Sequence, residues 1–146
     1  MTTASSSSGS GALVANDIGT KITLGAGVVF AASIGTHIQC NTGALIYLAN
    51  SYTISGGAAA HILQLAGGIV DVDAAITVTL TGTPVWSVAG VISEAGGVVN
   101  FGSNVTWSGA ASGQRFQTIA GGVINTNGAG VSWLPGSTAG TGAWYF

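Results

Sequence analysis

The tripeptide Ala-Gly-Gly occurs three times in the second half of the chain, each time in front of a similar run of residues. The three copies read AGGIVDVDAAITV (66–78), AGGVVNFGSNVTW (95–107) and AGGVINTNGAGVSW (120–133). Each copy has two β-branched residues, then Asp or Asn, then a short polar or glycine-containing step and a second strand-like triplet. The copies begin 29 and 25 residues apart. A motif that recurs at such a spacing is typical of a repeat architecture.

The apolar runs of these copies have the residues and the periodicity of β-strands. Val, Ile, Thr and Trp dominate them, and such side chains fit the pleated surface of a sheet. The runs are short, and ITVTLTG (76–82) alternates apolar and polar residues. The segment 58–66 could form a short helix, but its counterparts, 86–95 and 112–120, contain an interior glycine or β-branched residues that disfavour helix. We therefore expect an essentially all-β chain.

The repeat spacing predicts a β-helix or β-solenoid, in which the chain coils and successive turns stack about 4.8 Å apart. Two upstream segments, 17–30 and 37–48, show the same alternation without paired glycines and are interpreted as degenerate copies. Residues 12–146 then form a single all-β repeat domain after a flexible Ser/Gly-rich segment, residues 1–11. Because the copies differ in length, a β-sandwich or jelly roll is the alternative.

Equivalent residues of a stacked coil form columns along its axis. Asp71, Asn100 and Asn125 occupy equivalent positions, so we expect them to stack at a structural corner. Asp and Asn tolerate left-handed backbone angles and hydrogen-bond their own turn, which suits a corner. The paired glycines would make the bend before it. A second column is expected through Val78, Trp107 and Trp133.

Only 4% of the residues are charged and the net charge is −2, which limits the partners of this chain. Two basic residues cannot neutralise a run of phosphates, so we expect no nucleic-acid binding. Every apolar run stops short of the roughly 18 residues of a membrane helix, so we expect no membrane insertion. The N-terminus lacks the basic and apolar regions of a signal peptide. A single soluble chain usually has more charged side chains on its surface than this one. We therefore expect much of the surface to be buried against other copies of the chain, in a homo-oligomer.

No pattern in the sequence supports catalysis, a metal site or a cofactor. Asp71 and Asp73 would share one face of a strand, as calcium ligands or an acid/base pair can, but later copies replace them with Asn or Gly, which favours a structural role. His37 and His61 lie 24 residues apart and could stack. They lack a third metal ligand, so we expect them to be hydrogen-bonded or to face solvent. Cys40 is expected to be a buried thiol.

Aromatic residues are concentrated in the second half of the chain. Exposed Trp and Tyr rings can stack on sugars, and Trp86, Trp144 and Tyr145 are the candidates for contact with a glycan or a partner. Trp107 and Trp133 are expected to fill the core or a subunit interface instead.

The segment SGQRFQTIAGGVINTNGAGVSWLPGSTAGT (112–141) resembles a pattern common in tail-fibre-like proteins of tailed phages and prophages. It departs from that pattern at Ala129, where glycine is usual, and in its final Trp-Tyr-Phe. The shared elements are Gly-Gln-Arg-Phe at 113–116, Gly-Val-Ile at 122–124, Thr-Asn-Gly at 126–128, the aromatic at 133, Pro-Gly at 135–136 and Ala-Gly at 139–140.

The resemblance implies a virion protein, commonly a homotrimer rich in β-structure, that serves as a fibre, spike or decoration subunit. The first hypothesis is therefore a non-enzymatic structural protein, made in the host cytoplasm, that acts in the virion by assembly and multivalent contact. Its N-terminal segment would attach to other virion proteins. The alternative is a receptor-binding module that recognises host surface glycan through exposed aromatics. A third hypothesis, a flat threonine-bearing surface-binding solenoid, lacks a regular Thr-x-Thr ladder in the sequence.

Overall fold

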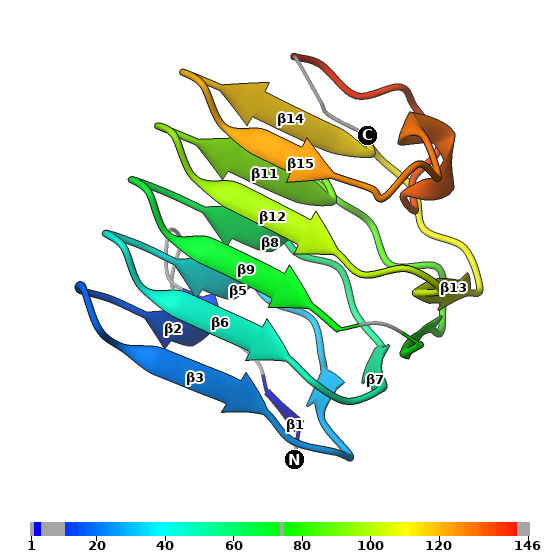
Figure 1. Ribbon diagram of the computed structural model, residues 1–146. Helices are drawn as coiled ribbons and strands as arrows, with labels where there is room; N and C mark the ends of the chain where they lie inside the picture. Colours follow the sequence, from blue (N-terminus) through cyan, green and yellow to red (C-terminus); the bar gives the residue numbers. More distant parts are fainter. Residues whose placement is uncertain (1, 4–10, 74, 143–146) are drawn as a thin grey trace.

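The protein is an all-β solenoid of about five turns. The structure is a computed structural model that describes residues 2–3, 11–73 and 75–142. Within these residues the strands form three parallel five-stranded sheets, and each full turn adds one strand to each sheet (Figure 1). Parallel pairing between successive turns is the pairing of a solenoid, so the β-solenoid prediction is confirmed and the sandwich alternative is wrong.

The three sheets are named A, B and C. Sheet A contains β1 (Thr2–Thr3), β4 (Val29–Phe30), β7 (Tyr52–Ile54), β10 (Thr77–Leu80) and β13 (Thr106–Ser108). Sheet B contains β2 (Gly11–Ala15), β5 (Thr36–Cys40), β8 (Ala60–Gln64), β11 (Val91–Glu94) and β14 (Phe116–Ile119). Sheet C contains β3 (Lys21–Leu24), β6 (Leu45–Leu48), β9 (Ile69–Val72), β12 (Val98–Phe101) and β15 (Val123–Asn125).

The sequence repeats correspond to turns of the coil. The first residues of the sheet C strands are register partners from turn to turn, and this alignment includes the two degenerate upstream copies. The longest copy has its extra residues in the connection 81–90 between β10 and β11. The segment 58–66 contains β8, as its counterparts in the other copies predicted. In the N-terminal segment predicted to be flexible, Thr2–Thr3 pair with β4 and Gly11 begins β2.

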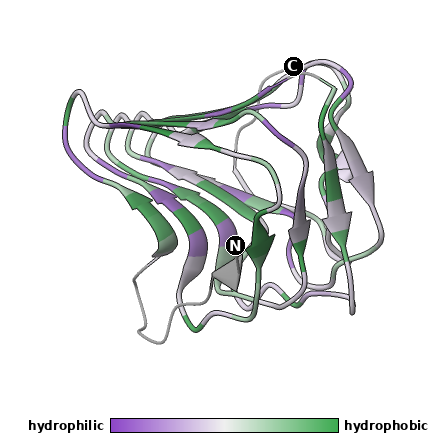
Figure 2. Ribbon diagram, turned by 90° about the horizontal axis from the view of Figure 1, so that it is seen from below, coloured by the Kyte–Doolittle hydropathy of each residue, from purple (hydrophilic) through white to green (hydrophobic). Residues whose placement is uncertain are grey.

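The core is a stack of inward-facing side chains. Viewed along the coil, the turns lie behind one another and enclose a common interior (Figure 2). Burial alternates along each sheet C strand, so that β9 buries Val70 and Val72 and leaves Ile69 more exposed. Full burial of an aliphatic side chain contributes about 1.5–3 kcal/mol. One fully buried column consists of Ile46, Val70, Val99 and Ile124.

The corner between sheets B and C lies at the Ala-Gly pair of each repeat. Ala66, Ala95 and Ala120 have φ angles of 49°, 50° and 50°, and the glycines that follow them have φ angles between 72° and 78°. The second glycine of each pair has a different role, because it lies against the preceding turn: a Cβ at position 122 would overlap the Ser93 carbonyl group. Alanine and the first glycine thus make the bend, and the second glycine permits close approach.

Asp71, Asn100 and Asn125 stack in register, but the prediction that they form the corner is wrong. They lie within or at the end of strands β9, β12 and β15, after the bend. Asn125 does stabilise a turn, since its Oδ1 accepts a hydrogen bond from the Asn127 N–H at 2.9 Å, and Asn127 has a φ of 52°. The column is therefore mainly a feature of the outer face of sheet C.

This difference within the column predicts unequal effects of the same substitution. Asn125→Val should lower the free energy of unfolding by about 1 kcal/mol, because the turn loses a side-chain hydrogen bond. Asn100→Val is the matched control, since the Asn100 side chain has no hydrogen bond to a described residue. Urea denaturation followed by tryptophan fluorescence measures both. An equal loss in the two variants would contradict the role assigned to Asn125.

The second predicted column is only partly formed by strands. Val78 and Trp107 are register partners in β10 and β13. Trp133 lies in a short 3-10 helix, η1 (Val131–Trp133), so the strand prediction there is wrong. The chain leaves the strand path after the left-handed residues Asn127 and Gly128. The Trp133 ring still packs against Trp107, with ring centroids 5.8 Å apart.

Candidate functional site

The predicted stacking of the two histidines is confirmed, and both lie in the core instead of facing solvent. His37 and His61 are at most 1% exposed. Their Nδ1 atoms lie 3.2 Å apart, the Tyr52 hydroxyl lies 2.8 Å from His61 Nε2, and His37 Nε2 lies 3.0 Å from the Ala31 carbonyl oxygen. Phe30 and Trp86 pack around these rings, with centroid distances of 5.5–6.1 Å to the two imidazoles. The result is a buried polar chain inside an aromatic cluster.

When both imidazoles are neutral, only one arrangement of protons satisfies every member of this hydrogen-bonded chain. The Ala31 carbonyl can only accept, so His37 donates from Nε2 and its Nδ1 accepts from the Nδ1–H of His61. His61 Nε2 is then free to accept from the Tyr52 hydroxyl. Burial lowers the pKa of His37 to about 4 and holds that of His61 well below its usual value, with His37 as a further cause. Both imidazoles are therefore neutral at pH 7, and the arrangement is structural.

The acidic residues and the cysteine do not come together. In the described ranges no three His, Cys, Asp or Glu side chains lie close enough to hold a metal ion. Asp73, just after β9, hydrogen-bonds the Tyr47 side chain and thereby raises the pKa of that phenol, while Asp71 lies two residues earlier in the strand. Cys40 is a buried free thiol, as predicted, and donates to the Ala44 carbonyl oxygen at 3.2 Å.

Of the three aromatic residues predicted to contact a glycan or a partner, the structure describes only Trp86. Trp86 is only 2% exposed, so its assignment as a contact residue is wrong: the connection 81–90 packs the indole into the core, beside the histidines. Trp144 and Tyr145 lie outside the described residues. Trp107 and Trp133 pack partly buried against the core, where Phe101 contacts both rings. They therefore pack against the edge of the core and keep part of each ring exposed.

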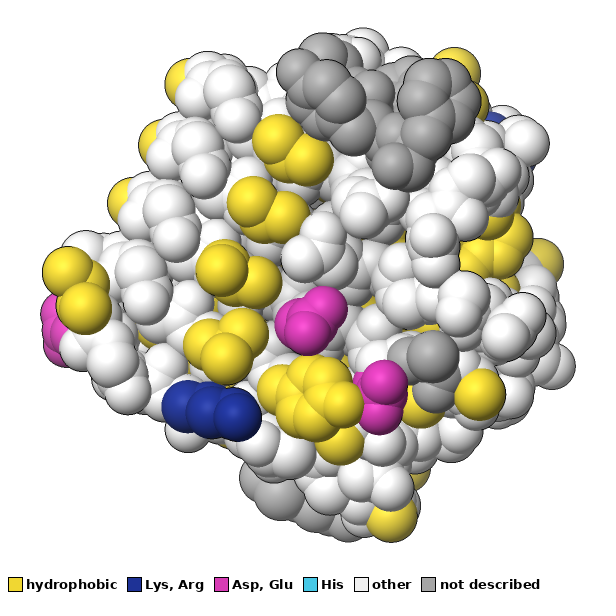
Figure 3. All heavy atoms as spheres, in the orientation of Figure 1, with side chains coloured by type: hydrophobic (Ala, Val, Ile, Leu, Met, Phe, Trp, Pro, Cys, Tyr) yellow, Lys and Arg dark blue, Asp and Glu magenta, His cyan; other side chains and the backbone are white. Residues whose placement is uncertain are grey.

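A column of apolar side chains runs along the outer face of sheet C. Figure 3 shows it as a continuous row over β6, β9, β12 and β15. Its members are the first residues of these strands and alternate with fully buried neighbours, and Ile69 is 40% exposed. We call this set the apolar column, and it consists of Leu45, Ile69, Val98 and Val123.

Charged groups lie at one end of the apolar column and beside it. Lys21 of β3 continues the column, and its Nζ lies 6.0 Å from the centre of the Tyr47 ring. Asp71 lies in the neighbouring column, next to Tyr47 (Figure 3). The apolar column was not predicted from the sequence, although a signal was present: the residue after each turn is apolar at a position that strand alternation places outside.

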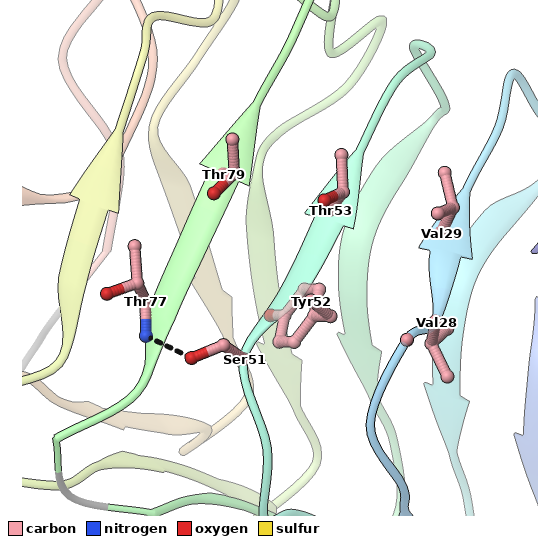
Figure 4. Close-up of a pocket in the computed structure, with 8 residues that line it drawn as sticks. Val28, Val29, Ser51, Tyr52, Thr53, Thr77 and Thr79 are labelled. Atoms are coloured by element: carbon pink, nitrogen blue, oxygen red, sulfur yellow. Dashed lines mark hydrogen bonds between the residues drawn. The ribbon is translucent and has the colours of Figure 1, made fainter.

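The outer face of sheet A has a shallow hollow of about 180 Å³ lined by hydroxyl groups. Ser51, Thr53, Thr77 and Thr79 point toward it from β7 and β10 and the residue before β7, and the Ser51 Oγ accepts a hydrogen bond from the Thr77 N–H (Figure 4). The Thr77 and Thr106 hydroxyls lie 3.0 Å apart. A short ladder of hydroxyls thus exists on this face. No acid or histidine lines the hollow, so none of these hydroxyls has a base beside it there.

Comparisons with protein-family models, with curated proteins and with solved structures gave no match for this chain. Within the residues that the structure describes, no helix has the length and apolar character needed to cross a membrane.

Proposed function

We propose that this chain is a structural subunit of a bacteriophage particle, in a fibre, spike or decoration, and that it acts by assembly with copies of itself and with other virion proteins, without catalysis. The apolar column on the outside of the solenoid carries this proposal. On this proposal, the protein is made in the host cytoplasm and reaches the outside of the cell as part of the virion. The resemblance of residues 112–141 to tail-fibre-like proteins supports this assignment and a trimeric state.

A single chain in water would leave the apolar column exposed. The apolar column spans four turns, about 14 Å along the axis. Contiguous exposed apolar surface marks an interaction site, and three such columns that meet around a threefold axis are removed from water together. The face carries Lys21 at one end of the column and Asp71 and Asp73 beside it, so charges of both signs are available for pairing between copies. A second copy of the chain is therefore the partner that this face fits.

Disruption of the apolar column should dissociate the assembly. Ile69→Asp places a carboxylate in the middle of the column, where burial against another copy would cost several kcal/mol. We expect the wild-type chain to sediment at three times the mass of one chain at micromolar concentration, and Ile69→Asp to sediment at the mass of one chain. Sedimentation velocity and light scattering measure both.

The matched control is Ile119→Asp, because Ile119 is 41% exposed, nearly as much as Ile69, and lies at the end of β14 in sheet B. This variant should keep the wild-type mass. A monomeric wild-type chain, or equal dissociation in both variants, would overturn the assignment of sheet C as the interface.

Binding of a host glycan is the second candidate function. A hollow that is lined by Trp107 and Trp133, at the C-terminal end of the solenoid, favours it.

A further inference from the structure

The C-terminal end of the solenoid has two adjoining hollows that share a cation. One has a volume of about 270 Å³ and is lined by Trp107, Trp133 and the loop 134–136. The other has a volume of about 240 Å³ and is lined by Phe116 and part of the loop 139–142. Arg115 and Ser132 line both hollows, and no acidic residue lines either of them.

Arg115 has no electrostatic partner in the described part of the chain. Its Nε is buried without a hydrogen bond, and its guanidinium forms no ion pair or hydrogen bond with a described residue. A buried donor without a partner costs about 1–3 kcal/mol, and more for a charged group, so such groups are rare in folded proteins. Nε itself is buried, so an anion in the hollow would supply an acceptor to the terminal nitrogens of the guanidinium.

The loop that lines the hollow beside Arg115 is held in place from the core. Leu134 is buried, and the Trp86 indole N–H donates to the Pro135 carbonyl oxygen at 3.1 Å. The backbone N–H of Arg115 donates to the Thr138 carbonyl oxygen at 3.2 Å, which fixes the loop against the residues at the start of β14. At Gly136 the backbone lies so close to Arg115 that a Cβ would contact its side chain. The hollow is therefore preformed, which reduces the entropy lost on binding.

Two tryptophans give the same hollow an apolar side. Trp107 and Trp133 both line it and are partly exposed, and their mutual packing and contact with Phe101 fix the orientation of the rings. Fixed indole rings bind the apolar C–H surface of a sugar, while the Ser132 hydroxyl can donate to or accept from a sugar hydroxyl. A guanidinium binds a carboxylate through two parallel hydrogen bonds.

We propose that this hollow binds a carboxylate-bearing sugar residue of a surface glycan, with Arg115 on the carboxylate and the tryptophan pair against the ring. The site belongs to the second candidate function and rests on it, but it does not depend on assembly. One cation suits one carboxylate and cannot hold a run of phosphates. Arg115 is the only arginine of the sequence and one of its two basic residues.

Titration with glucuronate, monitored by tryptophan fluorescence and calorimetry, tests this site. We expect saturable binding with a Kd on the order of 1 mM, as for a small ligand with few contacts. Glucose, which lacks the carboxylate, and acetate, which lacks the ring, should each bind at least about tenfold more weakly, since each loses about 1.4 kcal/mol or more. Binding of acetate as tight as that of glucuronate would overturn the sugar assignment.

The matched pair of variants is Arg115→Gln and Lys21→Gln, because each removes one of the two basic residues of the chain. Arg115→Gln should weaken glucuronate binding at least about tenfold, and Lys21→Gln should leave it unchanged. Arg115→Lys keeps the charge without the planar fork and should fall between them. Equal losses in the two glutamine variants, or none in Arg115→Gln with an unchanged circular dichroism spectrum, would overturn the proposal.

The same titration on Ile69→Asp separates this site from the assembly proposal. Binding of glucuronate by a chain that sediments as a monomer supports the hollow whatever the assembly state. A wild-type trimer without glucuronate binding overturns the hollow and leaves the structural role in place.

Discussion

The free energy of unfolding should fall by about 3 kcal/mol between pH 7 and pH 4 through His37 alone. The folded chain holds the pKa of His37 at about 4, whereas in the unfolded chain it returns to about 6.5. The unfolded state then binds more protons than the folded state across this window, so stability decreases as the pH falls through 6.5 and levels off near 4. His61 contributes in the same direction, because its pKa is also lowered. Urea denaturation at half-unit pH steps measures the loss.

Two further measurements assign this loss to the histidine pair. His37→Gln combined with His61→Gln should flatten the stability profile between pH 7 and 4, since no imidazole remains to bind a proton. In the native wild-type chain, NMR titration should show no imidazole protonation above about pH 5, because burial disfavours the charged form of both rings. An imidazole that titrates near pH 6.5 in the folded chain would contradict the buried neutral arrangement.

Gly122→Ala is expected to destabilise the chain by about 3 kcal/mol, at the upper end of overpacking effects. A Cβ at this position would overlap the Ser93 carbonyl group and the Glu94 amide nitrogen of the preceding turn. Backbone atoms cannot move aside without loss of the parallel ladder between β12 and β15 or between β11 and β14. Thermal and urea denaturation of the variant measure the effect.

The neighbouring glycine is the control for this substitution. Gly121 has a φ of 78°, and a Cβ there would meet no atom within 4 Å. Gly121→Ala should therefore cost only the left-handed strain of about 1–2 kcal/mol. Equal losses in the two variants would contradict the close approach at Gly122, because overlap with the preceding turn would then cost no more than the left-handed strain at Gly121.

Strand identity and register could be predicted because they depend on local patterns. Alternation of apolar and polar residues decides which side chains face inward, and the repeated Ala-Gly-Gly aligns successive turns. This was sufficient to place Asp71 beside Asn100 and Asn100 beside Asn125, and to assign the segment 58–66 to a strand. The same alternation also implied the outward position of Ile69, and only its meaning as part of an exposed column was missed.

The position of the corner could not be predicted from residue preferences alone. Asn and Asp have a higher tendency toward left-handed angles than Ala, yet the chain places Ala66 in that region and keeps Asp71 in a strand. The stacked turns compensate for the strain, because the parallel ladders on both sides of the bend form only if the bend occurs there.

The sequence by itself determined the all-β class, the stacking of the repeats and the register of Asp71, Asn100 and Asn125, because these follow from a local period and from its recurrence. Only the tertiary structure decided that Trp86 lies in the core, that His61 bonds His37 and Tyr52, and that the loop 134–138 packs against Arg115, whose guanidinium has no partner among the described residues. These contacts join residues from different turns or connections. Their positions depend on how loops of unequal length pack against the coil, which no local pattern specifies.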